Sequence, residues 1–143
     1  MLRVAIIGTG NISPSHIKGY LKFPDRCKIV ALVDIFPEKA EEKKRKFNLD
    51  DAQVYDDHKK ILDRDDIDLI DVCTPPYVHA EIAINGLNAG KNVLVEKPMA
   101  ASLEECDAML AAQKRSGKLL TVVAQNRFLA GYMNLKKTLD SGL

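Results

Sequence analysis

The sequence predicts a single α/β domain in which helices cover both faces of a doubly wound, mostly parallel sheet of six strands. Short continuous runs of Val, Ile and Leu alternate along the chain with stretches of helical periodicity. The runs mostly lack the polar alternation of a sheet with one wet face, which indicates strands buried on both faces. Strand–helix alternation with short loops specifies a parallel sheet with right-handed crossovers. The 143 residues suffice for one such domain with a real core.

Six segments have the composition of buried strands. The clearest is 3–8 (RVAIIG), whose apolar run ends directly at a glycine. The segment 52–55 (AQVY) is the weakest of the six. The other four, in chain order, are 28–34 (KIVALVD), 68–73 (DLIDVC), 91–95 (KNVLV) and 119–125 (LLTVVAQ).

Five helices are expected, and most have recognisable start or stop signals. Ser13 can cap a first helix that begins at Pro14, where the missing N–H costs no hydrogen bond. Ser102 precedes Glu105 with the spacing of a capping box and opens a helix that runs through residue 115. The remaining stretches are 37–47, 77–89 and 134–143, and Gly90 and Gly117 suit the ends of the two helices before them.

The composition excludes several classes of function. Lys and Arg number 21 against 20 Asp and Glu, so no electrostatic footprint indicates nucleic acid or an anionic membrane as a partner. Aromatic residues are only 6%, without Trp, which leaves little material for stacking on bases. No segment approaches a membrane span or a signal peptide. Cys27, Cys73 and Cys106 match neither zinc-site nor disulfide spacing, so we expect no metal, reduced thiols and a cytoplasmic location.

The first strand leads into a glycine motif, GTGNIS at 8–13. Ligands of open parallel sheets bind beyond the carboxyl ends of the strands, so this position favours a binding site. Gly8 permits the tight turn, and Gly10 lets the main chain approach a pyrophosphate that helix N–H groups stabilise. Ser13 replaces the third glycine of the usual fingerprint, which suggests wider helix–strand packing or a capping role for Ser13. A plain strand-to-helix turn is the alternative interpretation.

The second strand ends at Asp34, near the spacing of about 20 residues at which an acid reaches an adenosine ribose. We expect Asp34 to accept both ribose hydroxyls and to repel a 2′-phosphate. Ile35 follows where an NADP-binding protein would place an Arg, so NAD is the preferred cofactor and NADP the less favoured one. Lys39 is the nearby residue that would soften this preference. A simple helix cap is the alternative role for Asp34.

The next two strands end in unusual segments. Residues 73–79 (CTPPYVH) hold two prolines, which fix a rigid wall against which a flat ring can pack, and His79 is either structural or catalytic there. His16 carries the same ambiguity. The strand at 91–95 runs into Glu96, Lys97 and Pro98. Lys97 is placed to donate a proton to a substrate oxygen, and Glu96 to hold it or tune it, with a loop ion pair as the alternative. Pro98 stops the strand, through a cis bond if the turn is tight.

These motifs together, GTGNIS with His16, the strand ending at Asp34, TPPYVH, VEKPMA and AQNRF, closely resemble the Gfo/Idh/MocA family of oxidoreductases over essentially the whole chain. The resemblance implies the NAD(P)-binding Rossmann domain of that family. It also implies that Arg127 helps to close the nicotinamide end. We therefore expect Lys97 to be catalytic, and the cofactor to be bound by Gly8, Thr9, Gly10, Asn11, Ile12, Asp34, Ile35, Cys73, Thr74, Pro75, His79, Glu96, Lys97, Gln125 and Asn126.

The resemblance also implies a second domain. Family members transfer hydride between nicotinamide and a carbinol or carbonyl, usually of a sugar or cyclitol, and continue into a domain that binds substrate and forms the oligomer. We expect 1–127 to be the dinucleotide-binding domain and 128–143 to begin the linker helix to a second domain that this chain lacks. Apolar residues that would pack on that domain are then exposed: Phe128, Tyr132, Met133, Leu135 and Leu139.

The expected function follows from that division. The full-length protein is expected to be a homo-oligomeric, NAD-dependent oxidoreductase with a polyol or sugar-like substrate, whereas this chain alone binds NAD without turnover. Two alternatives stay open. One is a non-catalytic nicotinamide-binding or redox-sensing module, and the other is a scaffold of the same fold with a different ligand.

Overall fold

A computed structural model describes residues 1–142 and contains one six-stranded sheet with the order β3-β2-β1-β4-β5-β6. All neighbouring strands pair in parallel, so the predicted doubly wound fold is confirmed. The strand order reverses between β1 and β4, which creates the crevice where open α/β sheets bind ligands. The strands are β1 (Leu2–Ile7), β2 (Cys27–Val33), β3 (Gln53–Tyr55), β4 (Leu69–Val72), β5 (Asn92–Val95) and β6 (Leu120–Val122).

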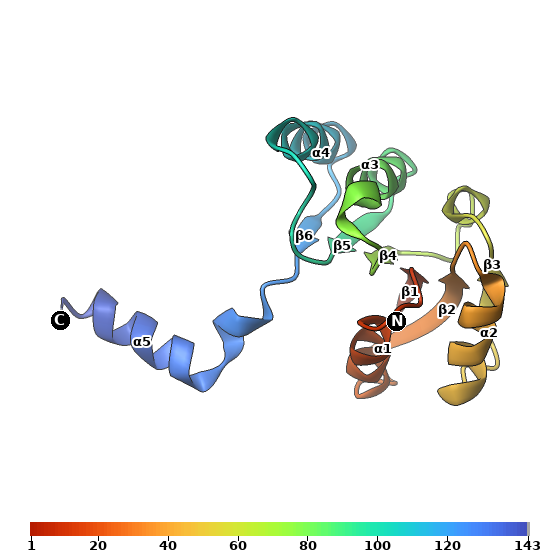
Figure 1. The fold of residues 1–143 in the computed structure, drawn as a ribbon, viewed down its shortest axis with the longest axis horizontal. Helices are drawn as coiled ribbons and strands as arrows, with labels where there is room; N and C mark the ends of the chain where they lie inside the picture. Colours follow the sequence, from red (N-terminus) through yellow and green to blue (C-terminus); the bar gives the residue numbers. More distant parts are fainter. Residues whose placement is uncertain (143) are drawn as a thin grey trace.

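Helices cover both faces of this sheet, with α1 and α2 on one side and α3 and α4 on the other (Figure 1). The predicted serine cap of α4 is present, because the Ser102 hydroxyl accepts from the N–H of Glu105 at 3.2 Å, whereas the Glu105 carboxylate accepts from the N–H of Ala101 at 2.9 Å and not from that of Ser102. The α-helices are α1 (Ser13–Leu21), α2 (Pro37–Lys46), α3 (His79–Asn88), α4 (Leu103–Ser116) and α5 (Ala130–Asp140), and the 3₁₀ turns are η1 (His58–Ile61), η2 (Pro76–Val78) and η3 (Gln125–Phe128).

Two apolar layers hold the sheet, as its continuous apolar strands predict. On one side Ile70 is buried with Leu87 of α3 and Met109 of α4, and on the other Ile6 is buried with Ile17 of α1. Burial of such side chains stabilises the fold by about 1.5–3 kcal/mol each. The central strands are therefore packed on both faces, which fixes the positions of their carboxyl ends.

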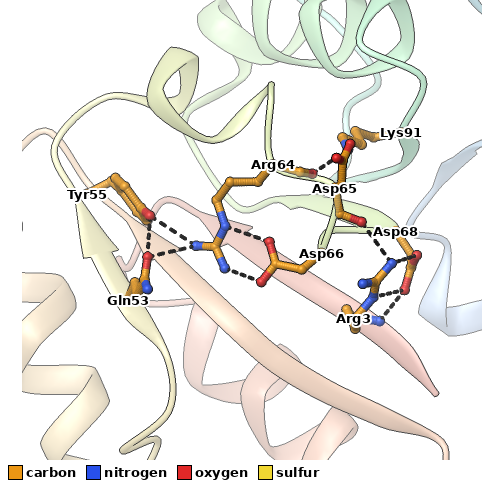
Figure 2. A network of polar contacts seen from close by, with 8 residues as sticks. All are labelled: Arg3, Gln53, Tyr55, Arg64, Asp65, Asp66, Asp68 and Lys91. Carbon is orange, nitrogen blue, oxygen red and sulfur yellow. Dashed lines mark hydrogen bonds and ion pairs between the residues drawn. The ribbon is translucent and has the colours of Figure 1, made fainter.

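A polar network ties the segment before β4 to the amino end of the sheet (Figure 2). Arg3 binds both carboxylate oxygens of Asp68, at 2.9 and 2.7 Å, and these bonds hold the pKa of Asp68 down at about 2. Arg64 binds Asp66 in the same two-pronged way, at 2.8 and 2.6 Å. Lys91 completes the network by donating to the main-chain oxygen of Arg64 at 2.6 Å. Because β1 and β4 both begin at this network, it holds the end opposite to the one where ligands bind.

The chain after β6 leaves the sheet. Helix α5 begins at Ala130, four residues earlier than predicted from the sequence, and extends away from the domain (Figure 1). Leu143, the last residue of the predicted helix, lies outside the described residues. No helix among residues 1–142 is long and apolar enough to cross a membrane. The expected exposure of apolar side chains in this segment is confirmed for Phe128, Tyr132, Met133, Leu135 and Leu139.

Candidate functional site

Three neighbouring strands, β1, β4 and β5, each end directly before a segment that contains predicted site residues. The N–H of Gly8 bonds to the Val33 oxygen at 2.8 Å, so the glycine motif begins where β1 still pairs with β2. The N–H of Glu96 bonds to the Val72 oxygen at 3.0 Å, which places the β5 tip beside the β4 tip. The sheet therefore brings the glycine motif and the segments at 73–75 and 96–98 to one edge.

Gly8 is required by two independent features of the first turn. Its φ is +89°, a conformation that residues with a Cβ rarely adopt. A Cβ at this position would also lie 2.8 Å from the main-chain carbonyl carbon and oxygen of Cys73. The glycine thus permits the tight turn, as the sequence indicated, and also allows that turn to pack directly on the β4 tip.

Gly10 differs from Gly8, because a Cβ built there meets no atom within 4 Å. Gly10 is exposed in the turn that leads into α1. Within residues 1–142, the N–H groups of Gly10, Asn11 and Ile12 make no hydrogen bond in the structure. Free donors at the positive end of a helix suit a phosphate group, so the loop fits the predicted pyrophosphate.

Ser13 does not cap the first helix. It is the first residue of α1, is fully buried, and donates its hydroxyl hydrogen to the Gly10 oxygen at 2.9 Å. The expectation that α1 starts at Pro14 with Ser13 as its cap is therefore wrong. The serine instead stabilises the glycine turn through this buried hydrogen bond to Gly10.

Asp34 holds the glycine loop from the β2 tip. Its Oδ2 accepts from the N–H and the hydroxyl of Thr9, at 2.8 and 2.7 Å, and its Oδ1 accepts from the N–H of Phe36 at 3.0 Å. A carboxylate offers about four acceptor positions, so one position on Oδ1 is left for a ligand. Ile35 is 78% exposed beside it, and the Lys39 ammonium lies 4.3 Å from the centre of the Phe36 ring.

The β4 tip contributes one unpaired polar atom and one fully used histidine. Cys73 is buried beneath the glycine turn, and the Thr74 hydroxyl oxygen is the buried side-chain polar atom of residues 1–142 that has no hydrogen-bond partner. His79 is completely buried, with Nδ1 2.9 Å from the Pro98 oxygen and Nε2 2.8 Å from the Thr74 oxygen. Both ring nitrogens therefore lie at hydrogen-bond distance from main-chain oxygens, one next to each of the two strand tips. Pro75 is extended, as predicted for a rigid wall.

At the β5 tip, Lys97 is exposed and its ammonium makes no ion pair within the described chain. Glu96 is buried and points instead toward His16, with its second oxygen accepting from the Lys97 N–H at 3.0 Å. The alternative of a Glu96–Lys97 ion pair is thus wrong for this structure. The Lys97–Pro98 peptide bond is cis, as the turn suggested.

Gln125 and Asn126 lie in η3 and are exposed. Gln125 lines a groove of about 640 Å³ on the α1 side of β5 and β6, together with Phe23, Leu94 and Phe128. His16 of α1 also lines this groove, whereas Asn126, the glycine loop and Asp34 do not.

One buried residue of this region was missed in the sequence. Asp71 is fully buried in β4 and binds both His16 and Tyr20. Its position in the middle of an apolar strand was the signal that could have identified it, because a carboxylate buried in a sheet needs hydrogen-bond partners.

Comparison with known proteins identifies the family. Residues 2–124 match the family model described as "Oxidoreductase family, NAD-binding Rossmann fold" (GFO_IDH_MocA). The chain is 34% identical over 140 residues to the inositol 2-dehydrogenase/D-chiro-inositol 3-dehydrogenase of Halalkalibacterium halodurans, covering 97% of this chain and 40% of that protein. It is 28% identical over 142 residues to the inositol 2-dehydrogenase of Salmonella typhimurium, covering 99% and 42%. The chain thus spans less than half the length of these relatives.

Solved structures agree with this assignment. The WlbA dehydrogenase of Bordetella pertussis, in complex with NADH and UDP-GlcNAcA, superposes with a TM-score of 0.93 and 30% identity, over 99% of this chain and 42% of that one. The myo-inositol dehydrogenase of Lactobacillus casei, in complex with NAD(H) and myo-inositol, gives 0.92 and 30%, over 100% and 42%. The predicted NAD-binding Rossmann fold is confirmed.

Proposed function

This chain belongs to the Gfo/Idh/MocA family of oxidoreductases, and we propose that it is the NAD-binding part of an enzyme that acts on a polyol or sugar-like substrate. One observation carries the proposal: an open glycine loop with free N–H donors lies on the same sheet edge as the unpaired ammonium of Lys97. The relatives named above, two of them in complex with NADH or NAD(H), support the choice of cofactor and of substrate class.

The chain's own residues divide the work of binding the cofactor. The free N–H groups of residues 10–12 and the positive end of α1 bind the pyrophosphate. Asp34 accepts a hydroxyl of the adenosine ribose at its free position on Oδ1, and its charge disfavours the 2′-phosphate of NADP. Asp34 also holds the N–H groups of Thr9 and Phe36, but it does not cap α2, because the cap position of that helix is Phe36 and no side chain of residues 1–142 bonds the first helical N–H groups.

Lys97 acts at the other end of the site. Bound NAD supplies the group that accepts or donates the hydride. Lys97, exposed and free of partners in residues 1–142, hydrogen-bonds the substrate oxygen and passes a proton to or from it. Its free ammonium favours an enzyme over the alternative of a non-catalytic sensing module, because binding alone does not need a proton donor there.

We assign residues 1–127 to dinucleotide binding and 128–143 to the start of a linker helix toward a second domain, an assignment supported by relatives that are more than twice as long as this chain. In the full-length protein we expect a homo-oligomer located in the cytoplasm, where the free cysteines of this chain would stay reduced. The 143-residue chain by itself is expected to bind NADH without turnover.

The test is a pair of glycine substitutions with opposite expected outcomes. A Cβ at Gly10 or at Gly19 of α1 meets no protein atom within 4 Å, so neither Gly10→Ala nor Gly19→Ala should unfold the chain. We expect Gly10→Ala to weaken NADH binding at least about tenfold by titration calorimetry, because its methyl group occupies the approach to the loop. Gly19→Ala should bind NADH as the parent chain does.

Two results would contradict the proposal. One is equal affinity of the parent chain and Gly10→Ala for NADH, and the other is the absence of NADH binding by the folded parent chain. A thermal melt of each variant checks that any lost affinity comes from the loop and not from unfolding.

A further inference from the structure

His16 reaches from α1 to carboxylates on two neighbouring strands. Its Nδ1 lies 2.8 Å from Oδ2 of Asp71 in β4, and its Nε2 lies 3.0 Å from Oε1 of Glu96 after β5. Asp71 is fully buried, Glu96 is buried, and the His16 side chain is only 11% exposed. A helix residue thus bridges the ends of two strands inside the protein.

The two bonds define the charge of the bridge. An ionised carboxylate only accepts hydrogen bonds, so both ring nitrogens of His16 must carry a proton. Burial lowers the pKa of His16, but the hydrogen bonds and charges of Asp71 and Glu96 outweigh burial and raise that pKa to about 9. The imidazolium therefore persists at neutral pH.

The remaining groups around His16 are uncharged donors. Tyr20 of α1 donates to Asp71 at 2.9 Å, and the Cys73 thiol lies 3.7 Å from the other oxygen of Asp71. Burial raises the pKa of both the Tyr20 hydroxyl and the Cys73 thiol, so both keep their protons. His16, Asp71 and Cys73 lie close enough to share a cation, but protons already fill these positions and the thiol stays neutral.

Glu96 connects His16 to the main chain of Lys97. Its Oε1 faces His16, whereas its Oε2 accepts from the main-chain N–H of Lys97 at 3.0 Å. On the far side of Lys97, the Pro98 oxygen is held by His79 at 2.9 Å. The Lys97 side chain itself has no bond within residues 1–142, so its direction is set by the main chain on either side.

We propose that His16 is a positioning residue for Lys97: as a cation it fixes Glu96, and through Glu96 it fixes the main chain from which the lysine projects. This role rests on the proposed function, in which Lys97 faces the substrate oxygen. His16 touches neither substrate nor cofactor in this scheme. It acts from α1, through Glu96, on the main chain of Lys97.

The experiment is a pH titration of the ligand-free 143-residue chain by NMR, from pH 6 to 10.5, with ¹⁵N-labelled histidine and backbone. We expect both ring nitrogens of His16 to be protonated at pH 7, with a midpoint near pH 9. The backbone amide of Lys97 should shift with the same midpoint. In Glu96→Gln, which can still accept from the Lys97 N–H, the His16 midpoint should fall by about 1–3 pH units.

His58→Gln is the matched control, because His58 pairs with Asp57 on a different part of the chain. This variant should leave the titration of the Lys97 amide unchanged. A His16 midpoint near that of a free histidine, or a Lys97 amide that does not follow His16, would overturn the proposal. The titration needs no cofactor, so a failure to bind NADH in the Gly10→Ala series would be recognised separately.

A third substitution, His16→Gln, should abolish the high-pH titration of the Lys97 amide. If that titration persists in His16→Gln, the proposal is also overturned.

Discussion

Asp34→Asn removes one negative charge from the predicted ribose site while keeping the size of the side chain. An Asn oxygen can still accept from both donors of Thr9, at the 2.8 and 2.7 Å positions of the parent carboxylate. Its amide then turns a donor toward the N–H of Phe36, which loses its acceptor at 3.0 Å. We expect a loss of about 1–3 kcal/mol in the free energy of unfolding from this one unpaired donor.

The same substitution should also weaken NADH binding. Oδ1 has one free acceptor position, so one charged hydrogen bond to the ribose is lost, which costs about 1.5–3 kcal/mol. This corresponds to roughly 10- to 150-fold in the dissociation constant. Titration calorimetry with NADH and with NADPH, below the melting temperature of the variant, measures both affinities.

The comparison of the two cofactors makes the test specific. Without the carboxylate charge, NADPH should lose less affinity than NADH, so the preference for NADH should shrink. Asp107→Asn, on the exposed surface of α4, serves as the control and should bind both cofactors like the parent chain. If Asp34→Asn binds NADH as tightly as the parent chain, or if the preference between the two cofactors is unchanged, the ribose assignment is refuted.

Three further predictions concern other parts of the site. Gly8→Ala should lower the melting temperature by several degrees or prevent folding, because its Cβ would lie 2.8 Å from the Cys73 main chain at a φ of +89°; a melt within one degree of the parent would contradict this. Lys97→Ala should leave the NADH dissociation constant within about threefold, since only its main chain is engaged in this structure. Because the pKa of His16 is raised in the folded state to about 9, its stabilisation is complete below about pH 6.5 and lost as the pH rises through 9. Urea unfolding should therefore show a loss of about 3 kcal/mol over this range that is missing in His16→Gln.

The elements that could be predicted are those whose signals lie within a few residues of one another. Apolar runs and start signals such as the Ser102 cap identified all six strands and the position of α4. The glycine motif and Asp34 were also local signals, since each directly follows a strand. The boundaries were less accurate where short 3₁₀ turns intervene, as at η2 before α3 and at η3 before α5.

The partners of the site residues could not be predicted in the same way. Glu96 and Lys97 are neighbours in sequence, and an ion pair between them was a reasonable hypothesis. The structure instead pairs Glu96 with His16, eighty positions away, because β5 ends beside the first turns of α1. Asp71 was hidden within an apolar strand, and its importance depends on α1 lying over β4. Such choices of partner are tertiary and leave no short-range pattern.

Some polar groups at this sheet edge are hydrogen-bonded to other protein groups and others are not. The first kind supports the site, and the second kind is available to bind a ligand. His16, Asp71 and His79 are buried, and their polar atoms are occupied by protein groups. The N–H groups of residues 10–12 and the Lys97 ammonium remain without partners in residues 1–142. Buried polar groups that were left unpaired would cost about 1–3 kcal/mol each, whereas exposed ones are satisfied by water until a ligand replaces it. The unpaired groups are therefore the ones available to a dinucleotide and its substrate, and the paired ones keep them in place.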